Sequence, residues 1–482
     1  MEKLSRALTG LMLALFALAL ALTLALAAQE GLSRHGLIGA LLAAACLTAF
    51  ILRLRRKRSP ELAESLGAGK AALVLSLVFL ALNGVWLLCF NLLPEGDYGR
   101  FWSDAVSLSR FGRLEGDAAL YDALYPHILG YASFLGLLLR LFGEQVAVAE
   151  WANLLLSLGI GLALYGICLR LFGLRAACAA FLLWTLCPSK TLYNALVLSE
   201  PLYTCLLLAY TLLLGFSERV ERLWAMALLG ALAGLILRGV NVARPIAAVC
   251  LIALGIWILF LRGRDLKKGR DWLRWGLFLA LLLAVYRPTG ALWDAHVQQV
   301  TGYEPAGIPG YNFYVGFNED TRGMYSEEDM ETFGRVLNEE AGGQPKAGQQ
   351  AMFALAAERI RSLSGKLPRL LLSKWKVFLA DDQAAVFYYG SSIPEGLRGP
   401  GNLICNTWYY TVILLALAGA WRLWRRREQG TVLTAPLFVL GLSLAQMLVE
   451  VSGRYHYSAL PMLVLLAACA GGAELGSETG EG

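Results

Sequence analysis

The sequence predicts an all-α, polytopic membrane protein, and three observations support this class. Hydrophobic residues make up 57% of the chain and charged residues only 16%, with a mean hydropathy of +0.56. Apolar runs of membrane-spanning length recur along the chain, which is not typical of a soluble protein. Basic residues gather in short clusters between these runs, so the net charge of +6 reports membrane orientation and requires no nucleic-acid partner.

The apolar runs predict about twelve transmembrane helices. The first run is too long for the core of a typical signal peptide, and we interpret it as a retained membrane helix. The expected helices lie at residues 7–28, 37–52, 71–93, 148–171, 174–188, 198–216, 223–240, 246–261, 272–286, 403–421, 432–451 and 459–470.

A further apolar segment, residues 125–142, is long enough to cross, and the basic clusters decide its placement. If it crosses the membrane, most of the later basic clusters fall on the side opposite the first basic cluster, residues 53–58. If it lies along the membrane surface or is re-entrant, all of them share one face, which the positive-inside rule favours. We therefore expect an in-plane juxtamembrane helix and cytoplasmic termini, and the short loops and composition favour a bacterial plasma membrane. The clusters are residues 53–58, 169–175, 217–222, 262–270 and 424–427.

This topology divides the chain into three parts. Residues 1–286 form a transmembrane module whose first external loop is 94–127. Residues 287–402 are the sizeable external soluble region, at roughly the minimum size of a domain. Residues 403–482 hold the last transmembrane helices and a short acidic tail.

The first external loop carries the strongest candidate for chemistry. Asp97 follows a helix end broken by Pro94, at the water boundary. A carboxylate there suits a base that takes the proton of an acceptor hydroxyl. Alternatively, Asp97 and Asp104 cap an interfacial helix or solvate the loop.

Other candidates lie near the same face of the membrane. Arg244 and Arg454 are suited to binding a phosphodiester and to stabilising a departing phosphate. Glu200, which opens a helix beside a proline, would contact a basic residue or a substrate hydroxyl, or act as a helix N-terminal charge. Arg244 could equally pair with Glu200, and Arg454 could be an ordinary loop charge. Tyr455 and His456 adjoin Arg454 in the last external loop.

Two candidates are weaker. Lys190 is a phosphate candidate, with an interface anchor as the alternative. His127 follows Pro126 and either contacts substrate or is a hydrogen-bonded structural residue.

The sequence predicts neither a cofactor nor an essential metal. The nine cysteines lie mostly in apolar runs without CxxC spacing, and no His or carboxylate pair has metal-ligand spacing. The phosphate-binding, dinucleotide-binding and GxSxG motifs are absent from the sequence. The energy for a transfer reaction must therefore come with the substrate, which suits a sugar activated by a lipid phosphate.

Five segments carry a resemblance to a known family through their order and spacing: DYGRFWSDAVSLSRFG, YPHILGYASFLGLLLRLFG, CPSKTLYNALVLSEPLYTCLLL, ARP and GRYHYSALPML. Over most of residues 70–470, this order and spacing resembles the GT-C superfamily of membrane glycosyltransferases. Its bacterial members similar to protein O-mannosyltransferases and aminoarabinose transferases match best. The resemblance implies a GT-C-like fold and makes Asp97 the catalytic base. The sequence departs from the family at Tyr98, where an Asp-Glu pair would have its Glu, and at His127, where a second proline is usual.

The expected function is transfer of a sugar from a polyprenyl-phosphate donor to a hydroxyl of a glycan, lipid or protein acceptor, on the extracytoplasmic side and with inversion. The alternatives are an enzyme similar to O-antigen ligases or polymerases with a diphosphate-linked glycan donor, a non-catalytic subunit of envelope assembly, and a transporter. The residues expected to bind substrate beside Asp97 are Asp104, His127, Lys190, Glu200, Arg244, Arg454, Tyr455 and His456.

Overall fold

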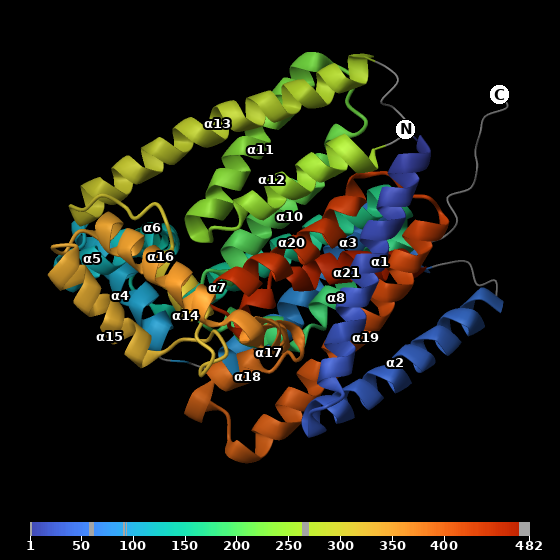
Figure 1. The fold of residues 1–482 in the computed structure, drawn as a ribbon. Helices are drawn as coiled ribbons and strands as arrows, with labels where there is room; N and C mark the ends of the chain where they lie inside the picture. The colour runs from blue at the N-terminus through green and yellow to red at the C-terminus, as the bar shows by residue number, and fades with distance from the viewer. Residues whose placement is uncertain (1, 57–61, 90–91, 93, 263–268, 472–482) are drawn as a thin grey trace.

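The computed structural model describes residues 2–56, 62–89, 92, 94–262 and 269–471, which form helices and loops and contain no β-strand (Figure 1). The amino-terminal part has three long helices followed by three shorter ones: α1 (Glu2–Ala27), α2 (Gly31–Arg56), α3 (Leu62–Cys89), α4 (Gly96–Phe111), α5 (Gly116–Leu124) and α6 (Pro126–Phe142). The central helices are α7 (Val146–Phe172), α8 (Leu174–Thr185), α9 (Pro188–Asn194), α10 (Glu200–Ser217), α11 (Leu223–Ala243), α12 (Ala247–Ile256) and α13 (Gly269–Thr301).

The later part has five short helices and then three apolar ones. The short helices are α14 (Gly310–Gly316), α15 (Glu327–Arg335), α16 (Pro345–Ser362), α17 (Leu367–Leu379) and α18 (Ala384–Tyr388). The apolar helices are α19 (Glu395–Arg425), α20 (Thr434–Leu448) and α21 (Ala459–Gly471).

The all-α, polytopic membrane class is confirmed, but the number of long spans is smaller than expected. Among the described residues, eight helices are long and apolar enough to cross a membrane, or nine if α5 and α6, bent by 117°, form one broken span. Four segments expected to cross are shorter apolar helices: Gly31–Cys46, Leu174–Thr185, Ala247–Leu261 and Ala459–Ala470. Length and composition therefore support eight of the twelve expected spans, and the in-plane placement of 125–142 stays a prediction.

The helix expected at 272–286 continues through Pro288 to Thr301, and the start of the external region at residue 287 stays a prediction. A proline inside a helix removes a backbone hydrogen bond and usually bends or ends the helix. Arg238 of α11 packs at this point and donates from Nη2 to the Tyr286 carbonyl at 2.6 Å. Its guanidinium also lies 3.9 Å from the Tyr286 ring centroid, so α11 supports α13 across the proline.

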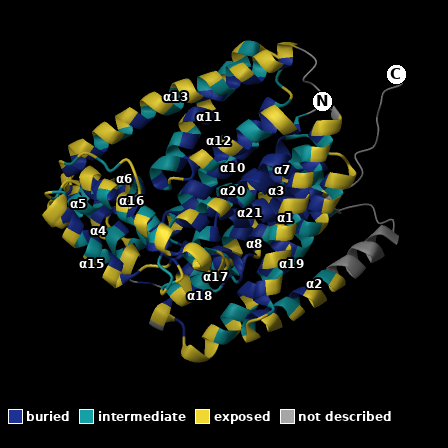
Figure 2. Ribbon diagram, viewed as in Figure 1, coloured by how far each residue is buried: buried dark blue, intermediate teal, exposed yellow. Residues whose placement is uncertain are grey.

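The core is centred on α21, which is buried along nearly its whole length. By contrast, only 22% of the most apolar part of α3 and of α13 is buried, and the exposed residues of α13 are visible in Figure 2. Apolar side chains on an outer face suit contact with lipid, because lipid tails are as apolar as leucine. The burial pattern therefore agrees with a helix bundle whose periphery faces a bilayer.

One end of the bundle collects the basic loops. Hydrogen bonds from the first turn of α1, from the segment after α12 and from the start of α13 connect the loops at this end. The bonds run from Ser5 Oγ to the Leu261 carbonyl at 2.7 Å, from Trp257 Nε1 to the Gln429 carbonyl at 3.0 Å and from Arg274 Nη2 to the Glu218 carbonyl at 3.3 Å. The clusters at 217–222, 262–270 and 424–427, where described, thus lie at one end, as the positive-inside argument expects.

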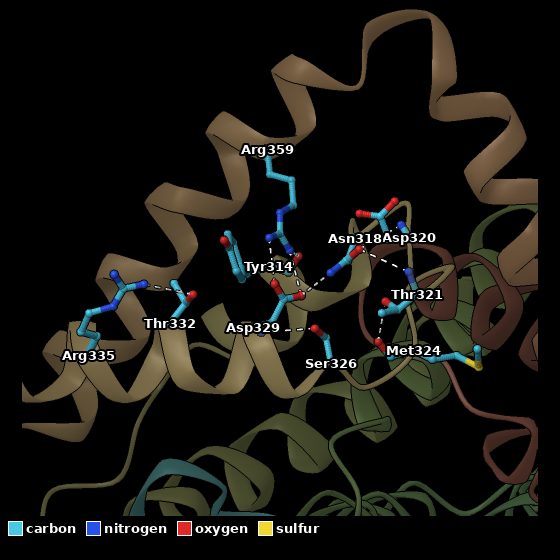
Figure 3. Close-up of polar contacts among 10 residues, drawn as sticks. All are labelled: Tyr314, Asn318, Asp320, Thr321, Met324, Ser326, Asp329, Thr332, Arg335 and Arg359. Carbon is cyan, nitrogen blue, oxygen red and sulfur yellow. Dashed lines mark hydrogen bonds and ion pairs between the residues drawn. The ribbon is translucent and has the colours of Figure 1, made fainter.

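The short helices pack together at the other end, near α4, α5 and α6 (Figure 1). Asp329 of α15 is buried and accepts a bond from Arg359 Nη2 of α16 at 2.8 Å (Figure 3). The same carboxylate accepts from Asn318 Nδ2 at 2.8 Å, and the Arg359 guanidinium lies 3.5 Å from the Tyr314 ring centroid. These contacts connect α14, α15 and α16 through polar groups in addition to their apolar core.

The packing of α19 on α21 gives a stability prediction. A Cβ added to Gly419 would lie 1.9 Å from the Leu466 carbonyl oxygen. Gly419→Ala must therefore push the two helices apart, and we expect a loss of about 1–3 kcal/mol, measured by thermal unfolding in detergent. Gly255→Ala in α12, where a Cβ meets nothing within 4 Å, is the control. Equal stability of the two variants would contradict the predicted contact.

Candidate active site

A cavity of about 1010 Å³ lies at the end of the bundle away from the basic loops. Its walls come from α4, the start of α6, α14, α18 and the loop after α20. Seven tyrosines contribute to the lining, which offers both aromatic faces and hydroxyl groups. Its charged lining residues include Asp97, Arg100, Arg244, Glu450 and Arg454. A large concave site with a few convergent polar groups is the usual form of a ligand-binding pocket.

Asp97 lies in the first turn of α4 and pairs with Arg454. Arg454 Nη2 is 2.5 Å from Asp97 Oδ2, although the residues are far apart in the sequence. The Asp97 side chain is 61% exposed and the Arg454 side chain only 12%. The structure thus brings the predicted base and the predicted phosphate ligand together at the cavity wall.

Arg454 uses only part of its hydrogen-bonding capacity. Its Nε is buried and has no hydrogen-bond partner among the described residues, although Glu200 Oε1 lies 3.9 Å away. An unpartnered buried donor is unusual and requires an explanation. A guanidinium can hold a phosphate with two parallel N–H bonds, so Arg454 retains donors for an anion in the cavity.

Arg244 ends α11 and meets Arg454 at a shared aromatic ring. The Arg244 Cζ lies 4.1 Å from the Tyr455 ring centroid, and the Arg454 Cζ lies 5.5 Å from the same centroid. The Tyr455 hydroxyl donates to Glu450 Oε1 at 3.3 Å. Burial raises the pKa of Glu450, although the charges of Arg454 and Arg244 oppose this shift. Sequence analysis missed Glu450, whose signal is a carboxylate immediately after an apolar helix.

Asp104 does not line the cavity but belongs to a charged group beside it. Arg100 Nε donates to Asp104 Oδ2 at 2.7 Å, and Arg100 Nη2 lies 3.7 Å from Asp122 Oδ1. Both carboxylates are buried, and burial raises the pKa of Asp104 against the opposing charge of Arg100. Arg100 therefore connects the cavity wall to two buried acids that sequence analysis did not group.

The remaining candidates divide between the cavity and the core. His127 lines the cavity, whereas Glu200 lies buried behind Arg454. Lys190 is fully buried outside the cavity lining and donates to Asn83 Oδ1 at 2.5 Å. His456 is also buried outside it, with Nδ1 2.8 Å from the Phe378 carbonyl. Of the nine predicted residues, the cavity brings together Asp97, His127, Arg244, Arg454 and Tyr455.

Within the part of the chain that the structure describes, no group of three or more His, Cys, Asp or Glu side chains could hold a metal ion. The expectation that the protein needs no metal stays a prediction.

Comparisons with known proteins give weak matches. No protein-family model matches the chain, and no curated protein matches it. The crystal structure of ArnT from Cupriavidus metallidurans bound to undecaprenyl phosphate matches 81% of this chain and 77% of that chain, with 14% identity and a TM-score of 0.36. The archaeal oligosaccharyltransferase AglB from Archaeoglobus fulgidus, in complex with an inhibitory peptide and a dolichol-phosphate, matches 85% of this chain but only 50% of that chain, with 12% identity and a TM-score of 0.44. At these scores the matches carry no argument about the site.

The surroundings of His456 give a pH prediction. Its Nε2 lies 3.2 Å from Asp382 Oδ1, and its ring stacks on Tyr409. Burial lowers the pKa of His456, but Asp382 and the Phe378 carbonyl outweigh burial and raise it above the ordinary 6.5. A histidine whose pKa is raised on folding stabilises the folded state. This stabilisation is fully present below the ordinary pKa, and it is lost as the pH rises through the raised value.

His456→Gln should therefore destabilise the protein most in acid, and its deficit against wild type should shrink as the pH rises. Thermal unfolding, measured from below the ordinary pKa to above the raised one, tests this difference. His35→Gln on an exposed face of α2 is the control. Parallel pH curves for His456→Gln and wild type would show that the imidazole does not titrate with folding.

Proposed function

We propose that the protein is an integral membrane glycosyltransferase of the GT-C type. It would move a sugar from a polyprenyl-phosphate donor to an acceptor hydroxyl on the extracytoplasmic side, with Asp97 as the general base. The observation that carries this proposal is the pairing of Asp97 with Arg454, a largely buried guanidinium whose Nε has no hydrogen-bond partner among the described residues. The order of the sequence motifs from Asp97 to Arg454 supports the same assignment.

In this mechanism the donor phosphate binds against Arg454 and Arg244. Both guanidiniums lie beside Tyr455, and both residues line the cavity. Phosphate offers more acceptor oxygens than one carboxylate, so it competes with Asp97 for the Arg454 donors. Donor binding would then free the Asp97 carboxylate to accept a proton.

The chemical step is a single displacement. Asp97 takes the proton of the acceptor hydroxyl, whose oxygen forms a bond to the anomeric carbon. The bond from that carbon to the phosphate oxygen breaks, and the phosphate keeps the electron pair. The two arginines stabilise the charge that develops on the phosphate. One displacement at the anomeric carbon inverts its configuration.

The first test compares wild type with Asp97→Asn for transfer from labelled polyprenyl-phosphate sugars. The amide keeps the size of the carboxylate but cannot accept the proton, so we expect transfer to fall roughly 10²–10⁴-fold. Asp117→Asn changes an exposed carboxylate of α5 and should transfer at the wild-type rate. Full activity of Asp97→Asn would remove Asp97 as the base. Transfer from a diphosphate-linked glycan alone would favour the ligase or polymerase alternative.

The second test concerns Arg454. Arg454→Lys keeps the positive charge but loses the planar fork that binds phosphate with two bonds. We expect kcat/KM for the donor to fall roughly 10²-fold or more, with a rise in the donor KM. Arg113→Lys, at an exposed position paired with Glu115, is the matched control. An unchanged donor KM and kcat/KM in Arg454→Lys would assign the phosphate to another residue.

A further inference from the structure

A second cavity, of about 490 Å³, lies at the basic end of the bundle, between the start of α1 and the end of α19. The two helices run side by side there, close to the amino terminus (Figure 1). Four cationic side chains line the cavity: Lys3, Arg6, Arg425 and Arg427. Among its described lining residues the only carboxylate is Glu428, so positive charge predominates.

Glu428 is already engaged in local structure. Its Oε1 accepts from the backbone N–H of Gln429 at 3.0 Å and from that of Gly430 at 2.8 Å. This carboxylate therefore holds the turn that follows α19. The described lining therefore carries a net positive charge, which attracts an anion.

A buried hydroxyl at the cavity gives an independent sign of a ligand. Thr9 lines the cavity and is only 4% exposed, and its Oγ1 has no hydrogen-bond partner among the described residues. Buried polar atoms normally find a partner, so an unpartnered one indicates a missing group. A phosphate oxygen is an acceptor that both this hydroxyl and the surrounding cations can use.

The aromatic wall of the cavity points to a lipid as the source of that anion. Trp424 lines it, and the indole packs so closely on α1 that a Cβ on Gly10 would lie 3.3 Å from Trp424 Nε1. Trp421 and Trp424 form an exposed aromatic pair with ring centroids 4.8 Å apart. Exposed tryptophans beside basic residues are typical of the level of lipid headgroups.

We propose that this cavity binds the headgroup of an anionic phospholipid in the leaflet at the basic end. Lys3, Arg6, Arg425 and Arg427 would surround the phosphate, and Trp424 would contact the start of the acyl chains. Basic pockets between transmembrane helices on the cytoplasmic side bind such headgroups by charge and hydrogen bonding. The proposal is independent of the glycosyltransferase assignment, because the two cavities lie at opposite ends of the bundle.

Arg427 allows a test in which loss of binding and misfolding are separable. Its φ is +55°, a conformation that glycine adopts without strain. The backbone N–H of Arg427 bonds to the Trp424 carbonyl, and that of Glu428 bonds to the Leu423 carbonyl, as in a helix end that usually carries glycine. Arg427→Gly therefore removes a cation and relieves backbone strain in the same step.

The experiment measures thermal unfolding of the full chain in nanodiscs of phosphatidylcholine, with and without added phosphatidylglycerol. Phosphatidylglycerol should raise the melting temperature of wild type and raise that of Arg427→Gly by less than half as much. In phosphatidylcholine alone, Arg427→Gly should melt at or above the wild-type temperature. Arg219→Gln removes an exposed charge at the same end but outside the cavity, and it should retain the full lipid effect.

Three results would overturn the proposal. One is an equal lipid effect in wild type and Arg427→Gly, because the cavity would then not be the binding site. The second is an equal rise in melting temperature with inorganic phosphate in detergent, because a free anion would then suffice. The third is loss of the lipid effect in Arg219→Gln. The rise in melting temperature would then come from the general positive charge of this face and not from the cavity.

Discussion

The candidate site depends on one constraint, the negative charge that Arg454 requires in a mostly buried position. A cation out of water is costly unless anions or hydrogen-bond acceptors surround it. Asp97 comes from α4 and Glu200 from α10, while Glu450 lies in the same loop as Arg454. Three regions distant in the sequence thus converge on one guanidinium. This convergence fixes the loop after α20 against the amino-terminal half of the bundle.

The sequence predicted the coarse structure well because apolar length and basic loops are local signals. Most expected helices appear near their predicted positions, and the described basic loops meet at one end. Four of the expected membrane spans are shorter apolar helices, and length alone does not decide whether a short helix crosses the membrane. The helix predicted at 272–286 continues to Thr301, and the contact from Arg238 that supports it beside Pro288 is made by another helix, so apolar length did not predict it.

The site was partly predictable for a related reason. Asp97, Arg244 and Arg454 are charges at the ends of apolar runs, which makes them visible in the sequence. Lys190 gives the same local signal, yet its ammonium bonds to Asn83 of α3 in the core. Glu450 and the buried carboxylates of Asp104 and Asp122 could not be grouped with their arginines without the fold. Pairing of charges depends on contacts between distant segments, which local patterns do not encode.

Lys374 of α17 connects α14 to the loop that carries Glu450 and Arg454. Its ammonium donates to three carbonyls, those of Gly316 at 2.7 Å, Met447 at 2.9 Å and Val449 at 2.7 Å. The end of α14 and the end of α20 are therefore held by one buried group. A displacement of α14 would therefore disturb the position of this loop through Lys374. One buried cation thus joins two walls of the cavity, α14 and the loop after α20.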